Sequence, residues 1–264
     1  MSTGYRFPNI IGTSRAIEAI RIQMADAIDS DTDVLITGET GTGKELVAKE
    51  IHHNSLRKEH PLLVCNCNVV SRDVLLNQLL GHGKGAFPGA IEGKIGLFEA
   101  AEGGTLILDE IDHIPRDIQP SLLRVLEERK VQRLGETTSR SIDMRVIAIS
   151  NRNLPELVEA GRFLFDLCTR LKAFEIHLPP LRERLGDIPL LVEHFYQEAC
   201  LQLRRASAGF ATDAIEMLSR CPWPGNVREL RSVIRRVCAL AGEGECIQTH
   251  HLPSQFFAQD VNAK

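Results

Sequence analysis

Two short stretches of the chain hold residue types that suit phosphate chemistry. In the first, residues 38–44 read Gly-Glu-Thr-Gly-Thr-Gly-Lys. Glycine lets a backbone take positive φ and approach a ligand closely, so that successive amide groups can face phosphate oxygens. In the second, Asp109 and Glu110 directly follow the apolar run 105–108. A carboxylate pair of this kind can hold Mg²⁺ and polarise an attacking water, so the two stretches together predict a site for a nucleoside triphosphate.

The elements around the glycine loop have the order that such a site requires. Residues 34–37 form an apolar run typical of a buried strand, and apolar residues recur at helical spacing from Lys44 to about residue 54. The helix dipole adds to the field of the loop amides, and Lys44 can reach the terminal phosphates. We expect ATP to contact the loop through Gly38, Glu39, Thr40, Gly41, Thr42, Gly43, Lys44 and Glu45.

Glu45 occupies the position where the general pattern has a serine or threonine that holds magnesium. Either Glu45 faces away, or the metal is held from elsewhere. We expect Asp109 to bind Mg²⁺ through water and Glu110 to orient the attacking water. The alternatives are a glycine turn that binds nothing and an acid pair that only caps a strand. The strand, the helix and the second acidic motif together disfavour them.

Strand and helix patterns alternate through the first two thirds of the chain. We expect further strands over 62–66 and 144–149, and helices over 14–28, 69–80 and 118–128. This alternation predicts an α/β fold with a parallel sheet. Sites of parallel sheets lie at the carboxyl ends of the strands, so Asn66 and Asn151 should join the loop and Asp109 in one crevice. The glycine-rich segment 81–93 is predicted to contain no regular structure.

The alternation stops near residue 180, after two consecutive prolines, and helical patterns cover 187–204, 212–220 and 226–241. The sequence therefore predicts two domains, an α/β nucleotide-binding domain over 1–179 and a helical domain over 180–264. Near the start of the chain, Ile10 and Ile11 could line an adenine pocket, and packing at an edge explains them equally well.

Composition narrows the function. The chain has 264 residues, of which 43% are hydrophobic and 25% charged, and a formal net charge of −4. A surface of this charge is not built for tight nonspecific DNA binding, so DNA would be contacted through another module. The seven cysteines show no Cys-x-x-Cys pair, and Cys65 and Cys67 read as core thiols, with metal or redox work as the less favoured alternative. We expect a cytoplasmic protein without a membrane span.

Five motifs together resemble the central AAA+ ATPase domain of bacterial enhancer-binding proteins, the activators of sigma-54 RNA polymerase. These motifs are the glycine loop, Gly81-His-Gly-Lys-Gly-Ala-Phe-Pro-Gly-Ala90, Gly103-Gly-Thr-Leu-Ile-Leu-Asp-Glu110, Leu178-Pro-Pro-Leu-Arg-Glu-Arg184 and Trp223-Pro-Gly-Asn-Val-Arg-Glu-Leu230. The resemblance covers essentially the whole chain. It implies a parallel α/β core with an α-helical lid, assembled as a ring with ATP between subunits. A hexamer is the expected ring, with seven subunits left open.

The resemblance also implies roles for single residues. Asn66 resembles the residue that restrains Glu110, and Asn151 resembles the first sensor. Arg228 resembles the second sensor, which reaches from the lid to the phosphates, and Arg170 resembles a finger that acts on the neighbouring subunit's ATP. The family's sigma-54 contact loop corresponds to Gly85, Ala86, Phe87, Pro88, Gly89 and Ala90.

Two departures from the family pattern bear on hydrolysis and on the activation of sigma-54 RNA polymerase. Pro88 replaces the threonine of the contact loop, which removes a hydroxyl and an amide donor, and Leu164 replaces the arginine of a second finger position. The main hypothesis is an ATPase that remodels sigma-54 RNA polymerase holoenzyme. The alternative is a regulator that assembles with ATP but activates weakly or not at all. Another kind of P-loop machine, such as a helicase loader, is disfavoured because segment 81–90 matches one family.

Overall fold

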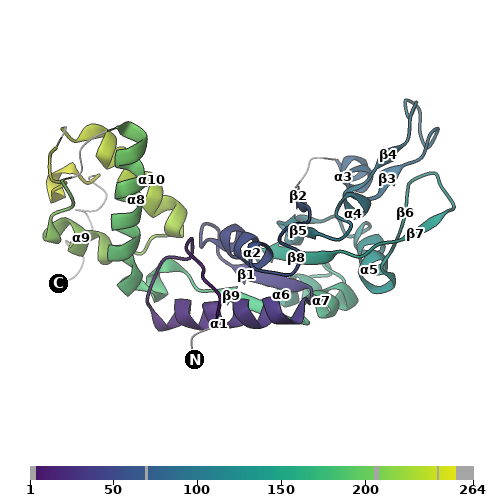
Figure 1. The fold of residues 1–264 in the computed structure, drawn as a ribbon, viewed down its shortest axis with the longest axis horizontal. Coiled ribbons are helices and arrows are strands. Elements are labelled where there is room, and N and C mark those ends of the chain that lie inside the picture. The colour runs from purple at the N-terminus through teal and green to yellow at the C-terminus, as the bar shows by residue number, and fades with distance from the viewer. Residues whose placement is uncertain (1–3, 69–70, 205–207, 243, 254–264) are drawn as a thin grey trace. The chain divides into compact units, whose positions relative to one another are not determined.

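The computed structural model describes residues 4–68, 71–204, 208–242 and 244–253, and Figure 1 labels their elements. The chain divides into two compact units. The first unit consists of Met1–Phe7, Arg21–Gly38 and Lys44–His177. The second unit consists of Pro8–Ile20, Glu39–Gly43 and Leu178–Lys264. The middle of the glycine loop thus belongs to the same unit as the C-terminal helices.

The first unit is built on a five-stranded sheet of order β2-β5-β8-β1-β9. The strands are β1 (Val34–Gly38), β2 (Leu62–Asn66), β5 (Thr105–Asp109), β8 (Arg145–Ser150) and β9 (Glu175–Leu178). β1 pairs with β8, β8 with β5 and β5 with β2, each in parallel. The predicted parallel sheet is therefore confirmed. β9 was not predicted, because its four residues lie at the point where the alternating pattern ends.

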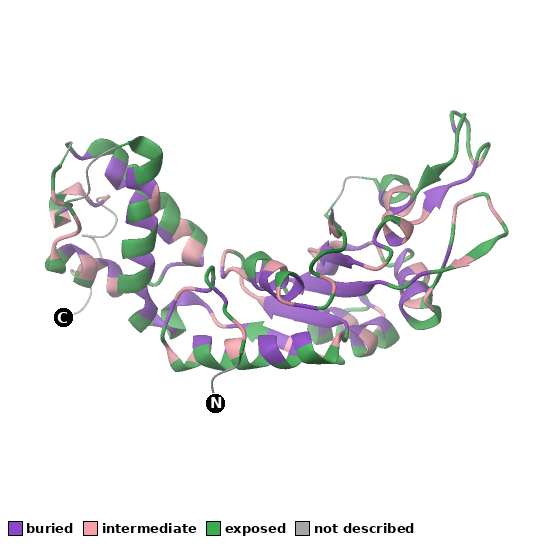
Figure 2. Ribbon diagram, viewed as in Figure 1, coloured by how far each residue is buried: buried purple, intermediate pink, exposed green. Residues whose placement is uncertain are grey.

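Helices pack on both faces of this sheet (Figure 1). They are α1 (Arg15–Ser30), α2 (Lys44–His53), α3 (Arg72–Leu80), α4 (Leu97–Ala100), α5 (Gln119–Glu128), α6 (Leu154–Glu159) and α7 (Phe165–Leu171). Besides α2, the helices predicted over 14–28, 69–80 and 118–128 are confirmed as α1, α3 and α5. The expected start of α3 at Val69 lies outside the described residues. Figure 2 shows β1, β5 and β8 buried along almost their whole length.

Segment 81–93 departs from the prediction at its start. Gly81–His82 is the short strand β3, which pairs antiparallel with β4 (Lys94–Ile95). Gly81 has φ 72°, and a Cβ placed there would lie 2.3 Å from the carbonyl oxygen of Lys94. The glycine that suggested a loop therefore permits a close approach of two strands. A second hairpin, β6 (Lys130–Gln132) with β7 (Ser139–Ser141), runs beside the first in Figure 1.

The second unit is helical, as predicted. It contains α8 (Ile188–Leu203), α9 (Thr212–Ser219) and α10 (Asn226–Leu240), together with the short 3-10 helices η2 (Leu181–Glu183), η3 (Leu185–Asp187) and η4 (Thr249–His251). Its core surrounds Trp223, whose indole N–H donates to the Leu218 carbonyl at 2.8 Å. No helix in the described part of the chain is both long enough and apolar enough to cross a membrane.

Candidate functional site

The glycine loop joins β1 to α2 with the backbone geometry that the residue types predict. Gly38, Gly41 and Gly43 have φ values of 143°, 83° and 108°, which other residue types rarely adopt. Lys44, the first residue of α2, is buried, and its Nζ donates to the Gly38 carbonyl at 2.7 Å. The lysine ammonium is therefore held against the first residue of the loop.

Glu45 lies in the first turn of α2 with an exposed side chain. One of its carboxylate oxygens lies 2.7 Å from the Nζ of Lys49, one helical turn further along. Of the two expectations for this residue, this pair on the exposed helix surface agrees with the one in which Glu45 faces away, and the place of the metal stays a prediction.

The end of β5 carries the acidic pair. The Glu110 N–H donates to Asp109 Oδ1 at 2.9 Å, and Glu110 itself has φ 55°. Burial raises the pKa of Asp109, and the nearby charges of Glu110 and Glu45 raise it further, while the Glu110 hydrogen bond and the Lys44 charge oppose the shift. A partly desolvated carboxylate gains from a bound cation, and oxygen donors are what Mg²⁺ prefers, so the residues present suit magnesium.

The neighbouring strand ends bring the two predicted asparagines to the same edge of the sheet. Asn66 lies opposite Asp109 in the pairing of β2 with β5. Its Oδ1 accepts the Asn68 N–H at 2.8 Å. Asn151 directly follows β8, whose last residue lies opposite Thr37 of β1, and the Asn151 N–H donates to Asp112 at 3.1 Å. The predicted gathering of these residues at the carboxyl edge is thus observed in the first unit.

Arg170 lies at the other edge of this sheet. Its guanidinium donates to Asp33 Oδ2 at 2.8 Å, and Asp33 directly precedes β1. Asp33 also accepts a hydrogen bond from Arg129 at 2.5 Å. Because β1 separates Asp33 from Gly38 by about 16 Å at an ordinary strand rise, Arg170 is remote from the carboxyl edge of its own sheet. Leu164, at the start of α7, packs against the core.

In the second unit, Arg228 and Ile11 have different surroundings. Arg228 lies in the first turn of α10 with an exposed side chain, and its N–H donates to the Gly41 carbonyl at 3.2 Å. Ile11 packs against the helical core, which agrees with the packing alternative. An adenine contact for Ile11 stays a prediction.

Sequence reasoning missed the partners of Glu39. Its carboxylate accepts hydrogen bonds from Arg182 and from Asn226, residues far away along the chain. Both partners lie in motifs that carry the family resemblance, so these motifs indicated that the residues matter. Nothing in the spacing of the motifs indicates which residue of the loop they contact.

The tip of the β3–β4 hairpin is held by turn hydrogen bonds. Gly85 and Gly89 have φ values of 80° and 99°, and the Gly85 N–H donates to the Ala90 carbonyl at 2.8 Å. The Phe87 side chain is 42% exposed, and its ring centroid lies 4.9 Å from that of His82. Pro88 is exposed beside it.

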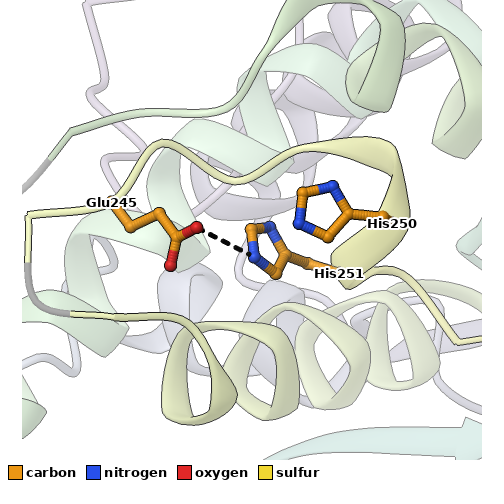
Figure 3. Close-up of side chains that lie close together, drawn as sticks. All are labelled: Glu245, His250 and His251. Atoms are coloured by element: carbon orange, nitrogen blue, oxygen red, sulfur yellow. Dashed lines mark ion pairs between the residues drawn. The ribbon is translucent and has the colours of Figure 1, made fainter.

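Glu245, His250 and His251 could supply ligands to a metal, because one ligand atom from each lies within 4.8 Å of the others (Figure 3). However, Nδ1 of His251 accepts the Gln248 N–H at 3.0 Å in a capping box. The proton of a neutral His251 ring then sits on Nε2, which faces Glu245 Oε1 at 3.4 Å. The His251 side chain therefore caps η4, and its ring directs no lone pair at the cluster.

Cys65 and Cys67, the other candidate pair, are both buried in the core of the first unit. This burial agrees with their interpretation as core thiols.

Comparison with protein families assigns both parts of the chain. Residues 10–177 match the model described as "Sigma-54 interaction domain", and residues 182–264 match the "AAA+ ATPase lid domain". The chain belongs to the sigma-54 interaction domain family. The α/β P-loop NTPase core of this family and its helical lid are thus the two folds described above, and the resemblance drawn from the motifs is confirmed.

Relatives of this sigma-54 interaction domain are transcriptional regulators. It is 46% identical over 242 residues to the DNA-binding transcriptional activator HyfR of Escherichia coli K12, covering 92% of this chain and 36% of HyfR. It is 43% identical over 250 residues to the anaerobic nitric oxide reductase transcription regulator NorR of Aeromonas hydrophila, covering 95% of this chain and 49% of NorR. The chain thus spans half the length of these relatives or less.

A solved structure supports the fold. The crystal structure of NtrX from Brucella abortus in complex with ADP superposes with a TM-score of 0.86 at 31% identity, covering 96% of this chain and 56% of the NtrX chain. NtrX has also been solved in complex with ATP, again with a TM-score of 0.86.

Proposed function

We propose that this chain is the ATP-binding and ATP-hydrolysing domain of a transcriptional regulator that remodels sigma-54 RNA polymerase holoenzyme at promoters. One observation carries the proposal. Gly38 ends one strand and its carbonyl holds the buried Lys44, while Asp109, followed by Glu110, ends another strand of the same parallel sheet at its carboxyl edge. The nucleotide complexes of NtrX and the family of the chain support it.

The residues of this edge and Arg228 divide the work of phosphoryl transfer. The loop amides and Lys44 bind the phosphates, and Arg228 reaches them from the lid. Asp109 holds Mg²⁺ through water, and the metal supplies neutralisation of the charge that develops on the phosphate oxygens. Glu110 accepts the proton of the attacking water, Asn66 restrains Glu110, and Asn151 senses the terminal phosphate.

Hydrolysis takes place between subunits of a ring, with six subunits expected. Arg170 supports this part of the proposal, because the Asp33 contact places it at the amino edge of its own sheet. From there it is suited to the ATP of a neighbour. Assembly must release or redirect the Arg170 guanidinium from Asp33. In other phosphoryl-transfer systems, an arginine supplied in this way stabilises the transition state and raises the rate about 10³–10⁵-fold.

The hairpin tip, Gly85 to Ala90, contacts sigma-54 and transmits the effect of ATP hydrolysis to it. Residues 1–179 then serve as the nucleotide-binding domain and 180–264 as the lid. We place the protein in the cytoplasm and assign DNA contact to a module outside these 264 residues. HyfR, a DNA-binding transcriptional activator of which this match covers only 36%, is in line with that assignment.

The test of the function combines two measurements on the same protein. Phosphate release is followed against protein concentration, and sigma-54 is then captured in the presence of a transition-state analogue of ATP hydrolysis. We expect turnover per subunit to rise with concentration and capture to depend on the analogue. Turnover without any capture would refute the remodelling function and support a regulator that only assembles with ATP. Failure to bind ATP would refute the proposal as a whole.

A further inference from the structure

The segment Glu39–Gly43 of the glycine loop is fastened by side chains from the start of the lid, all within the second unit. Arg182, in η2, places its two terminal nitrogens 2.9 Å and 2.6 Å from the two carboxylate oxygens of Glu39. A guanidinium bound to both oxygens fixes orientation as well as distance. The first residue of the segment is therefore tied to the lid.

Asn226 fastens the next part of the segment. It is fully buried at the start of α10 with φ 53°, a conformation that asparagine tolerates better than most residues. Its Oδ1 accepts the Leu181 N–H at 2.7 Å, and its Nδ2 donates to the Thr40 carbonyl at 3.0 Å and to Glu39 at 3.2 Å. This side chain joins η2, α10 and the glycine loop.

Two more lid groups bind the carbonyls that follow. The Arg228 N–H donates to the Gly41 carbonyl at 3.2 Å, and the buried Arg184 guanidinium donates to the Thr42 carbonyl at 2.9 Å. Three successive loop carbonyls, of Thr40, Gly41 and Thr42, are therefore bound by the lid. In a planar trans peptide the C=O and the next N–H point in opposite directions. Binding these carbonyls consequently turns the Gly41 and Gly43 N–H groups away from the lid contacts.

The close approach at Gly41 shows how tightly this segment is held. A Cβ at this position would lie 2.4 Å from the Gly225 carbonyl oxygen, so a side chain is excluded there by the lid backbone as well as by the φ of 83°. The Glu39 carboxylate, if unpaired, would repel phosphates bound by the same loop. Arg182 offsets that charge.

We propose that Asn226 and the Arg182–Glu39 pair are positioning residues that keep the loop amides in their phosphate-binding conformation and thereby set the rate at which ADP leaves. The inference rests on the proposed function, because it assumes that this loop binds nucleotide. It gives the Glu39 side chain a role other than the direct ATP contact expected from the sequence.

The proposal is tested by the dissociation rate of a fluorescent ADP analogue from the full chain. Asn226→Asp keeps the size of the side chain and its acceptor for the Leu181 N–H, but it sets a negative charge against the Thr40 carbonyl and Glu39. We expect dissociation about 10-fold faster, since hydrogen bonds of this kind typically contribute one power of ten. Arg182→Gln should accelerate dissociation about 3- to 10-fold, because the negative charge of Glu39 is then no longer offset by a guanidinium.

A second substitution separates charge from packing. Adding Glu39→Gln to Arg182→Gln removes the carboxylate whose charge is no longer offset, so the double variant should release ADP more slowly than Arg182→Gln alone. Arg231→Gln is the matched control. Arg231 makes a comparable bidentate pair with Glu198 in the same unit, between α10 and α8, and touches no part of the loop in that pair. It should leave ADP dissociation within about twofold of the parent, the spread expected for an exposed ion pair.

The outcomes are distinct. If Asn226→Asp and Arg182→Gln release ADP at the parent rate, or if Arg231→Gln accelerates release as much as they do, the positioning role is refuted. A lowered melting midpoint without faster release also refutes it, since the contacts would then serve only stability. If the parent chain does not bind the analogue, the proposed function fails together with this inference, whereas parent binding with unchanged release in the variants refutes the inference alone.

Discussion

The carboxyl edge of the sheet and the tip of the β3–β4 hairpin position their residues by different means. At the edge, Gly38 and Asp109 end strands that are buried almost throughout, and the Gly38 carbonyl holds Lys44. At the tip, Phe87 and Pro88 are exposed and stand on a turn closed by the Gly85–Ala90 hydrogen bond. Packing of the core constrains the first region and leaves the second free to vary. Pro88, the departure that the resemblance indicates, lies in the second region.

The largest expected effect of a substitution concerns Arg170, which belongs to neither region of its own subunit. Arg170→Ala should lower turnover by about 10³-fold or more and abolish its rise with concentration, because a neighbour's ATP loses its finger. Phosphate release across a dilution series measures both effects.

The control for Arg170 is Arg129→Ala, which removes the other guanidinium bound to Asp33. It should leave the concentration dependence in place. Equal losses in the two variants would show that the Asp33 cluster matters only for folding, and the finger assignment would be wrong.

The second effect concerns Glu110. Glu110→Gln keeps the size of the side chain but cannot accept a proton, so turnover should fall by about 10²–10⁴-fold while ATP binding is retained. Single-turnover hydrolysis and equilibrium binding on the same sample separate the two quantities. Turnover equal to that of the parent would remove Glu110 from the site.

The third effect concerns Lys44. Lys44→Ala should weaken ATP binding by about 10- to 100-fold, because a charge-assisted contact to the phosphates is lost. Lys49→Ala on the same helix removes a lysine that pairs with Glu45 on the surface, and it should bind ATP as the parent does. Titration calorimetry measures both. Unchanged affinity in Lys44→Ala contradicts the phosphate-loop assignment.

The fourth effect belongs to the hairpin tip. Pro88→Thr should strengthen analogue-dependent capture of sigma-54 about threefold or more, since one hydroxyl and one amide donor become available and each hydrogen bond contributes about 1 kcal/mol. Pro88→Ala restores the amide alone and should give a smaller gain. ATP turnover should not change in either variant. Equal capture by parent and Pro88→Thr would mark proline here as a neutral variation and the tip as tolerant.

The smallest effect is on stability at the carboxyl edge. Burial raises the pKa of Asp109, so the fold disfavours its charged form, and this group's contribution to stability is lost as pH rises from the ordinary Asp value through the raised one. Asp109→Asn should therefore raise the melting midpoint of the nucleotide-free protein by roughly 1–3 °C at neutral pH. The gain should shrink toward acidic pH. A lower midpoint at neutral pH would contradict the burial argument.

Local patterns were sufficient for much of the fold. The apolar runs of β1, β2, β5 and β8 predicted their strands within one or two residues, and helical spacing predicted α8, α9 and α10. They were insufficient for Gly81–His82, where glycine marks a close strand pair, and for β9, which is too short to show a period. The division near residue 180 and the roles of the single site residues stay predictions.

Residue types alone were enough to find the glycine loop, the acidic pair and the family, because each depends on residue types at fixed short spacing. Tertiary structure decided which partners these residues have. Glu39 meets Arg182 across 143 positions of sequence, and Asp33 meets Arg170 across 137. A contact between such distant positions leaves no period or motif in the chain, since it arises only when separately folded elements bring two side chains together.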